Sequence, residues 1–93
     1  LAELATEADV TRAYVDQCIL AWNDGDLTDV DAAKAKWWAT DMQTRVVDRA
    51  LQLHGGYGYM VEYPVARAFV DMRVTRIYGG TSEVMREMIA RKL

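Results

Sequence analysis

Apolar residues recur along this chain at intervals of three and four, the spacing of one face of an α-helix. Valine and isoleucine do not alternate with polar residues, as they would in a half-buried strand, and the chain has a single proline. The pattern therefore predicts an all-α fold. Because the turns between the helices are short, we expect an up-down bundle of three to four helices that forms one domain over residues 1–93.

Two long helices make up the first half of the predicted bundle. The first runs from Leu1 to Asn23 and stops at Gly25, a residue suited to a left-handed turn. The second runs over residues 29–53, with Thr28 as its N-cap. At about 1.5 Å per residue this second helix is roughly 35 Å long, which is long for so small a domain.

Two shorter helices are predicted in the second half. Pro64 suits the first position of a third helix, where its missing N–H costs nothing, and this helix extends through Ile77. It stops at the glycine pair 79–80. Thr81 or Ser82 then caps a fourth helix that runs toward the end of the chain.

Charge and composition exclude several classes of function. The net charge is −3, and the eleven basic residues are mixed with fourteen acidic ones, so no basic stripe is present to bind nucleic acid. No apolar run reaches the roughly 18 residues that a membrane span requires. The single cysteine, Cys18, excludes an intrachain disulfide.

The apolar content predicts contacts beyond this chain. It amounts to 52%, slightly above the ordinary value of about 45–50%. The chain also begins at Leu1, without Met and already inside a helical pattern. We therefore expect a piece of a longer protein whose surplus apolar surface is covered by other segments or by other chains.

A first candidate site is the glycine corner at the end of the second helix. Its sequence is Gln52-Leu53-His54-Gly55-Gly56-Tyr57-Gly58-Tyr59. One left-handed glycine is enough to stop a helix, so three glycines in four positions suggest that the backbone passes close to something. A loop that contacts phosphates or a planar cofactor is one interpretation. A glycine-rich turn between packed helices is the other, and the pattern alone favours it.

A second candidate site is the corner before the fourth helix, with the sequence Ile77-Tyr78-Gly79-Gly80-Thr81-Ser82-Glu83. The glycines allow close approach, and the helix N-terminus offers unpaired N–H groups that favour an anion. An ordinary capped helix start explains the same residues equally well.

Other polar residues carry weaker signals. His54 has no second histidine and no acidic or cysteine cluster at ligand spacing, so no metal site is predicted. The basic residues of the third helix form either a solvated face, which we favour, or ion pairs at an interface: Arg67, Arg73 and Arg76.

Taken together, residues 41–93 resemble the C-terminal helical domain of the acyl-CoA dehydrogenases. The resemblance rests on the order and spacing of several motifs: Gln-x-x-Gly-Gly-x-Gly-aromatic at 52–59, Glu62-Tyr63-Pro64, Asp71, Arg76-Ile77-Tyr78-Gly79-Gly80-Thr81-Ser82-Glu83 and Ile89-Ala90-Arg91. Together these motifs are far more specific than either glycine corner alone.

The resemblance implies an FAD-dependent enzyme that oxidises an acyl-CoA thioester to the trans-2-enoyl form. By analogy, the first corner contacts the FAD pyrophosphate of a neighbouring subunit through Gln52, Leu53, His54, Gly55 and Gly56. The second corner lies by the adenine-side phosphates through Thr81, Ser82 and Glu83. Substrate lies against Tyr78, Gly79 and Gly80, where the Gly79 N–H polarises the thioester carbonyl.

One residue departs from many members of that family. Gly79 stands where those members carry the catalytic glutamate, and Glu83 lies a full turn further on, so it is no ready substitute. The long-chain and isovaleryl types of the family, which this sequence resembles at that position, also have a small residue there. They take the catalytic base from an earlier helix. We therefore expect no catalytic base within residues 1–93, so that this piece alone is inactive. The resemblance also implies that most of the cofactor is held by a β-sheet domain outside these residues, so we expect the piece alone to bind no FAD tightly.

Partners and alternatives follow from the same resemblance. It implies a homo-oligomer, dimer or tetramer, and an electron acceptor of the electron-transfer flavoprotein type. In the absence of a visible targeting segment we expect the cytoplasm, or the mitochondrial matrix if the source is eukaryotic. The alternatives are a non-catalytic helical assembly module and a flavin monooxygenase relative on the same fold.

Overall fold

The computed structural model describes all 93 residues, and it confirms the all-α prediction. It contains four α-helices and two short 3-10 helices, and no strand. The elements are α1 (Ala2–Asn23), α2 (Asp29–His54), η1 (Gly55–Tyr59), α3 (Pro64–Met72), η2 (Arg73–Arg76) and α4 (Ser82–Ala90).

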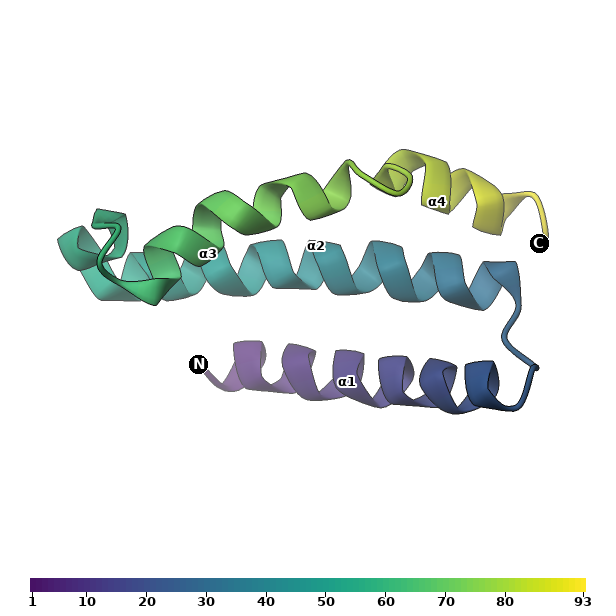
Figure 1. Ribbon diagram of the computed structural model, residues 1–93. Coiled ribbons are helices and arrows are strands. Elements are labelled where there is room, and N and C mark those ends of the chain that lie inside the picture. The colour runs from purple at the N-terminus through teal and green to yellow at the C-terminus, as the bar shows by residue number, and fades with distance from the viewer.

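The helices form a layer around α2, which is the longest element. α1 runs antiparallel to α2 along one side, and α3 and α4 follow one another along the opposite side (Figure 1). The reversal between α1 and α2 uses Gly25 at φ 76°, and the Thr28 hydroxyl caps α2 by accepting a hydrogen bond from the Asp31 N–H at 3.1 Å. Both of these local predictions are confirmed, and α2 becomes the platform on which the second half of the chain is placed.

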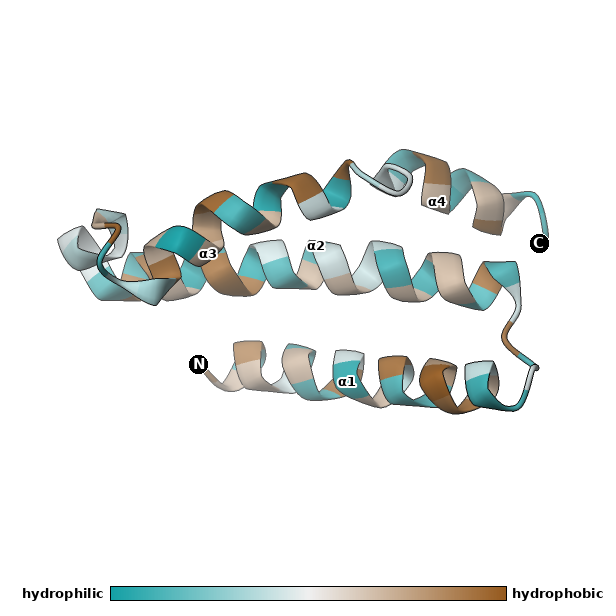
Figure 2. Cartoon of the chain, viewed as in Figure 1, coloured by the Kyte–Doolittle hydropathy of each residue, from teal (hydrophilic) through white to brown (hydrophobic).

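The core of this layer is thin. Only eight of the 93 residues are buried, and Ala33 of α2, Met72 of α3 and Met85 of α4 are among them. The apolar stripe predicted on α1 is largely exposed: Ile19 retains 52% and Trp22 71% of its accessible surface. Figure 2 shows strongly hydrophobic segments near the C-terminal end of α1. The structure therefore leaves apolar surface uncovered, as the composition predicts.

α3 is shorter than the sequence predicts. The pattern favours one helix through Ile77, whereas α3 ends at Met72 and continues as the tighter 3-10 helix η2. The Thr75 hydroxyl donates to the Met72 carbonyl at 2.6 Å, so it satisfies a backbone acceptor that a longer α-helix would have used. This tightening places the second glycine corner beside the middle of α2.

Gly58 fixes the first corner by close packing rather than by its backbone angles. A Cβ built on Gly58 would lie 2.6 Å from the Leu51 carbonyl oxygen and 2.9 Å from the Leu51 Cγ. Because the nearest atom is α2 backbone, a side chain cannot be accommodated by a rotamer change. Gly58→Ala is expected to lower the free energy of unfolding by about 2 kcal/mol, measured by denaturant unfolding of the full-length protein. An unchanged midpoint would show that η1 can move away from α2.

Candidate functional site

The first corner begins where α2 ends in a conformation that favours glycine. Gly55 has φ 62° and ψ −140°, and its N–H donates to the Gln52 carbonyl. In the residue before it, the His54 Nδ1 lies 2.7 Å from the Ala50 carbonyl oxygen. Because a carbonyl can only accept, Nδ1 is the donor in this contact.

The structure explains the need for glycine differently at each of the three positions of this corner. Gly55 is explained by its positive φ, and Gly58 by its approach to α2. Gly56 has neither reason: its φ is not positive, and a Cβ there would meet nothing within 4 Å. The surplus glycine is therefore Gly56, and its main chain faces open space.

The side chains before this corner lie at the surface. Gln52 and Leu53 border a hollow of about 580 Å³ between the C-terminal end of α2 and the N-terminal end of α1. The residues that line the hollow are Leu1, Ala2, Glu3, Leu4, Asp48, Arg49, Gln52 and Leu53. Leu53 retains 68% of its accessible surface, so it contributes little to the fold of this chain.

The second corner presents main chain on two successive glycines. Gly79 has φ 64° and Gly80 has φ 106°, and a Cβ on Gly80 would collide with the methyl group of Met85. The N–H groups of Gly79, Gly80 and Thr81 make no hydrogen bond within the chain. The Thr81 hydroxyl caps α4 by accepting from the Val84 N–H at 3.2 Å. The corner thus combines free N–H donors with the N-terminus of a helix, an arrangement that suits an oxygen acceptor.

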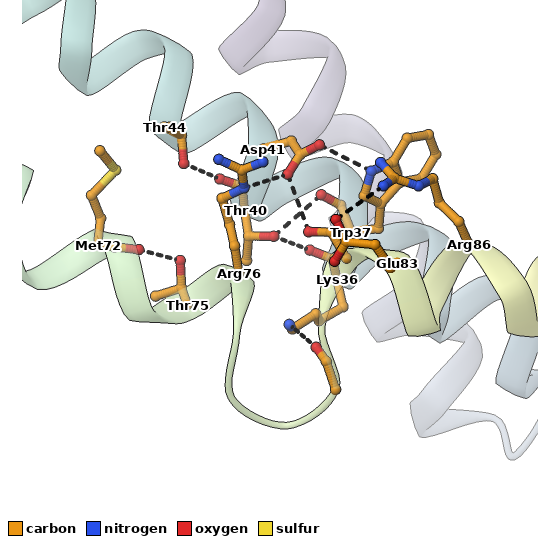
Figure 3. A network of polar contacts seen from close by, with 12 residues as sticks. Lys36, Trp37, Thr40, Asp41, Thr44, Met72, Thr75, Arg76, Glu83 and Arg86 are labelled. Atoms are coloured by element: carbon orange, nitrogen blue, oxygen red, sulfur yellow. Dashed lines mark hydrogen bonds and ion pairs between the residues drawn. The ribbon is translucent and has the colours of Figure 1, made fainter.

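Beneath this corner, Asp41 of α2 joins groups from both sides of the glycine pair. Its Oδ1 lies 2.9 Å from the Arg76 Nε and accepts a hydrogen bond from the Ser82 hydroxyl at 3.3 Å. Its Oδ2 accepts from the Trp37 Nε1 at 3.0 Å. Figure 3 shows Arg76 and Trp37 directed at Asp41. The Arg76 N–H does not point at the oxygen, so this contact is an ion pair without an aligned hydrogen bond.

Lys36, five residues earlier on α2, contacts the corner itself. Its Nζ donates to the Gly80 carbonyl oxygen at 2.5 Å, across 44 residues of sequence. Neither Lys36 nor Asp41 was singled out by the sequence analysis. A signal was available for Asp41, which is the only charged residue between Lys36 and Arg45, but nothing in the sequence pairs it with Arg76.

The arginines of α3 and η2 behave differently from one another. Arg76 is half-buried and pairs inside the chain with Asp41, so the favoured interpretation of a solvated face is wrong for this residue. Arg67 donates to the Val61 carbonyl at 2.6 Å, which braces the loop before α3. Arg73 is exposed and borders a small pocket of about 90 Å³ at the second corner. That pocket is lined by Arg73, Arg76, Ile77, Thr81, Ser82 and Glu83.

The predicted cofactor residues of α4 differ in what they offer. Ser82 is 2% exposed, and its hydroxyl is used by Asp41, so only its N–H remains free at the helix N-terminus. Glu83 is exposed and pairs with Arg86 at 3.3 Å on the same helix. Tyr78 retains 57% of its accessible surface, so it is available as a pocket wall.

The structure does not bring the two corners together. Gln52 follows Asp41 by eleven residues of α2, a distance of about 16 Å along the helix. The first corner lies at one end of the layer and the second beside its middle (Figure 1). A ligand at the first corner therefore approaches a different part of the surface from a ligand at the second.

Other features of the chain add no chemistry to these corners. Burial raises the pKa of the Tyr14 phenol, and the neighbouring Cys18 and Asp31 raise it further, but this cluster lies between α1 and α2. No group of three or more possible metal ligands is present. None of the helices combines the length and the apolar character that crossing a bilayer requires.

Comparison with known proteins identifies the family of this chain. The family profile described as "Acyl-CoA dehydrogenase, C-terminal domain" matches residues 1–93, the whole chain. The chain belongs to the acyl-CoA dehydrogenase family. Two relatives of this acyl-CoA dehydrogenase domain are the long-chain specific acyl-CoA dehydrogenases, mitochondrial, of Rattus norvegicus and Sus scrofa. They are 52% and 53% identical to it over 93 residues, and the chain covers 22% of the length of each.

Solved structures of the family share the same arrangement of helices. The crystal structure of acyl-CoA dehydrogenase from Geobacillus kaustophilus matches this acyl-CoA dehydrogenase domain with a TM-score of 0.95 and 47% identity. The match covers 98% of this chain and 24% of that chain. The open layer around α2 is therefore part of a larger family architecture.

Proposed function

We propose that this domain is the C-terminal part of an FAD-dependent acyl-CoA dehydrogenase that oxidises an acyl-CoA thioester to its trans-2-enoyl form. The observation that carries the proposal is the second corner, where two left-handed glycines leave successive N–H groups without a partner in the chain. Family membership over the whole chain supports the same activity. The acyl-CoA substrate lies, in this proposal, against Tyr78, Gly79 and Gly80.

The residues of both corners fit an FAD cofactor. Open space at Gly55 and Gly56 admits a bulky group to the main chain, and the start of α4 supplies free N–H groups for phosphate oxygens. In the proposal, Gln52 to Gly56 hold the pyrophosphate region of a neighbouring subunit's cofactor, and residues 81–83 hold the adenine-side phosphates. FAD, when bound, accepts the β-hydride of the acyl chain and so carries the redox chemistry.

The part of this chain in the reaction is polarisation rather than proton transfer. The Gly79 N–H donates to the thioester carbonyl, which stabilises the charge that develops there as the α-proton leaves. A Cβ at Gly79 would meet nothing within 4 Å, and no carboxylate stands at this position. We place the catalytic base on an earlier helix of the full-length protein, as in the long-chain type, and the identity of 52–53% to long-chain enzymes supports this subtype.

Expression of the full-length protein tests the proposal. We expect a yellow protein whose flavin absorbance is bleached by anaerobic addition of a long-chain acyl-CoA, while the isolated 93-residue chain retains no stoichiometric flavin. A colourless full-length protein would favour a non-catalytic assembly module. A yellow protein that acyl-CoA does not bleach, but that consumes NAD(P)H and oxygen, would indicate a flavin monooxygenase on the same fold.

We also propose that the domain contributes to homo-oligomer assembly, as a dimer or tetramer that passes electrons to an electron-transfer flavoprotein. Exposed apolar residues border two grooves on the surface formed by α1 and α2. Ile19 and Trp22 border one groove, and Val10 borders the other. Burial of such surface contributes about 25 cal/mol per Å² to association. The isolated chain is therefore expected to self-associate at micromolar concentrations in sedimentation velocity. A single monomeric species at high micromolar concentration would contradict this.

A further inference from the structure

A short stretch of α2 binds the loop of the second corner at three separate points. Asp41 meets Arg76 where the loop begins and Ser82 where it ends, and Lys36 binds the Gly80 carbonyl between them. Figure 3 shows Lys36, Asp41 and Arg76 close together at the open end of the loop, between its two ends. Each of these partners is at least 35 residues in sequence from the α2 residue that it contacts, so the contacts belong to the tertiary fold and not to the helices themselves.

We propose that Lys36 is a positioning residue that orients the Gly80–Thr81 peptide, with Asp41 fixing the two ends of the loop. This inference rests on the proposed function of the second corner. The peptide group is planar and trans, so a carbonyl directed at Lys36 sends the Thr81 N–H of the same peptide the opposite way, away from the Lys36 ammonium. The Thr81 N–H has no acceptor in the chain, so the orientation leaves it facing a ligand.

The two glycines make an orienting contact of this kind necessary. Gly79 and Gly80 both have positive φ, and glycine adopts positive and negative φ almost equally well. Two successive glycines therefore do not define the direction of their peptides by themselves. A contact from rigid α2 to the carbonyl of the second glycine selects one orientation.

Lys36 also changes the strength of the donor it orients. An ammonium group bound to a carbonyl polarises the whole peptide, and a polarised peptide has a more strongly donating N–H. The shared chemistry of the ligand is an oxygen acceptor, either a phosphate oxygen of the cofactor or the carbonyl oxygen of the thioester. These two sources can be separated, because loss of the first releases flavin and loss of the second slows bleaching of retained flavin.

The test uses four variants of the full-length protein. Lys36→Met removes the ammonium at nearly constant volume, and Lys36→Arg restores a cationic donor. Lys34→Met is the matched control, because Lys34 is exposed on the same helix and makes no hydrogen bond or ion pair. Ser82→Ala, which removes one end contact, provides a second way to loosen the loop.

Amide hydrogen exchange is the first readout, because it needs no activity. The amides that report on the loop are the hydrogen-bonded ones at its two ends, Tyr78, Val84 and Met85. We expect their exchange to rise about tenfold in Lys36→Met and less in Ser82→Ala. Exchange should return toward wild type in Lys36→Arg and stay unchanged in Lys34→Met. Amides of α1 serve as the internal reference. Unchanged exchange of these three amides in Lys36→Met, or an equal rise across α1, would overturn the proposal.

Flavin retention and bleaching are the second readout. Lys36→Met is expected either to lose flavin or to keep it and bleach at least about tenfold more slowly at saturating acyl-CoA, with rescue by Lys36→Arg. Wild-type flavin content together with wild-type bleaching would overturn the proposal while leaving the dehydrogenase intact. If the wild-type protein itself is not bleached, the proposed function fails and the exchange measurement alone decides whether Lys36 orients the corner.

Discussion

Replacing Asp41 with alanine should lower the free energy of unfolding by about 2–3 kcal/mol. The variant leaves Arg76 without a counter-charge and Ser82, which is 2% exposed, without a partner for its hydroxyl. The Trp37 Nε1 also loses its acceptor. Because the Asp41 side chain retains 18% and the Arg76 side chain 33% of its accessible surface, water screens part of the loss, so the value lies below that of a fully buried pair.

Denaturant unfolding of the full-length protein measures this effect, with Asp48→Ala as the control. Asp48 is exposed on the same helix and forms no ion pair, so its replacement should change stability by less than about 0.5 kcal/mol. Asp41→Asn separates charge from hydrogen bonding, since an amide oxygen can still accept from Ser82. Equal midpoints for Asp41→Ala and Asp48→Ala would show that α2 does not hold the second corner through this carboxylate.

The importance of Asp41 shows what the sequence can and cannot predict about this fold. Helix caps and stops depend on neighbours within a few residues, so Thr28 and Gly25 could be assigned from the sequence. Asp41 and Arg76 meet only because η2 folds back over α2, 35 residues further along the chain. A periodic pattern carries no information about which charge on one helix faces which charge on another.

The candidate site, like the fold, could be predicted from the sequence only in part. The motifs of the two corners are enough to indicate the family, because their order and spacing are specific. The reason for each glycine is not in the sequence: Gly58 is needed for its approach to Leu51, and this contact appears only when η1 packs on α2. The role of Lys36 could not be predicted from the sequence, because its partner is a main-chain carbonyl and every residue has one.

Gly56 is therefore the residue that decides whether the first corner is a ligand site or only a turn. The fold of this chain gives no reason for glycine at this position, since its φ is not positive and a Cβ would meet nothing within 4 Å. If the corner lies against a cofactor, Gly56→Val places two methyl groups where the cofactor approaches the main chain. Flavin affinity should then fall by about a hundredfold, or about 2.7 kcal/mol.

Titration of the full-length apoprotein with FAD measures this affinity, and unfolding of the same apoprotein shows whether the fold is affected. Gly56→Val should leave the unfolding midpoint of the apoprotein close to wild type, because open space surrounds the position. Gly58→Ala is the opposite control. Its Cβ would meet α2, so it should lower the unfolding midpoint of the apoprotein more than it lowers the affinity for FAD. A Gly56→Val protein that binds FAD as tightly as wild type would mean that this main chain faces no cofactor, and the first corner would then be a helix turn and nothing more.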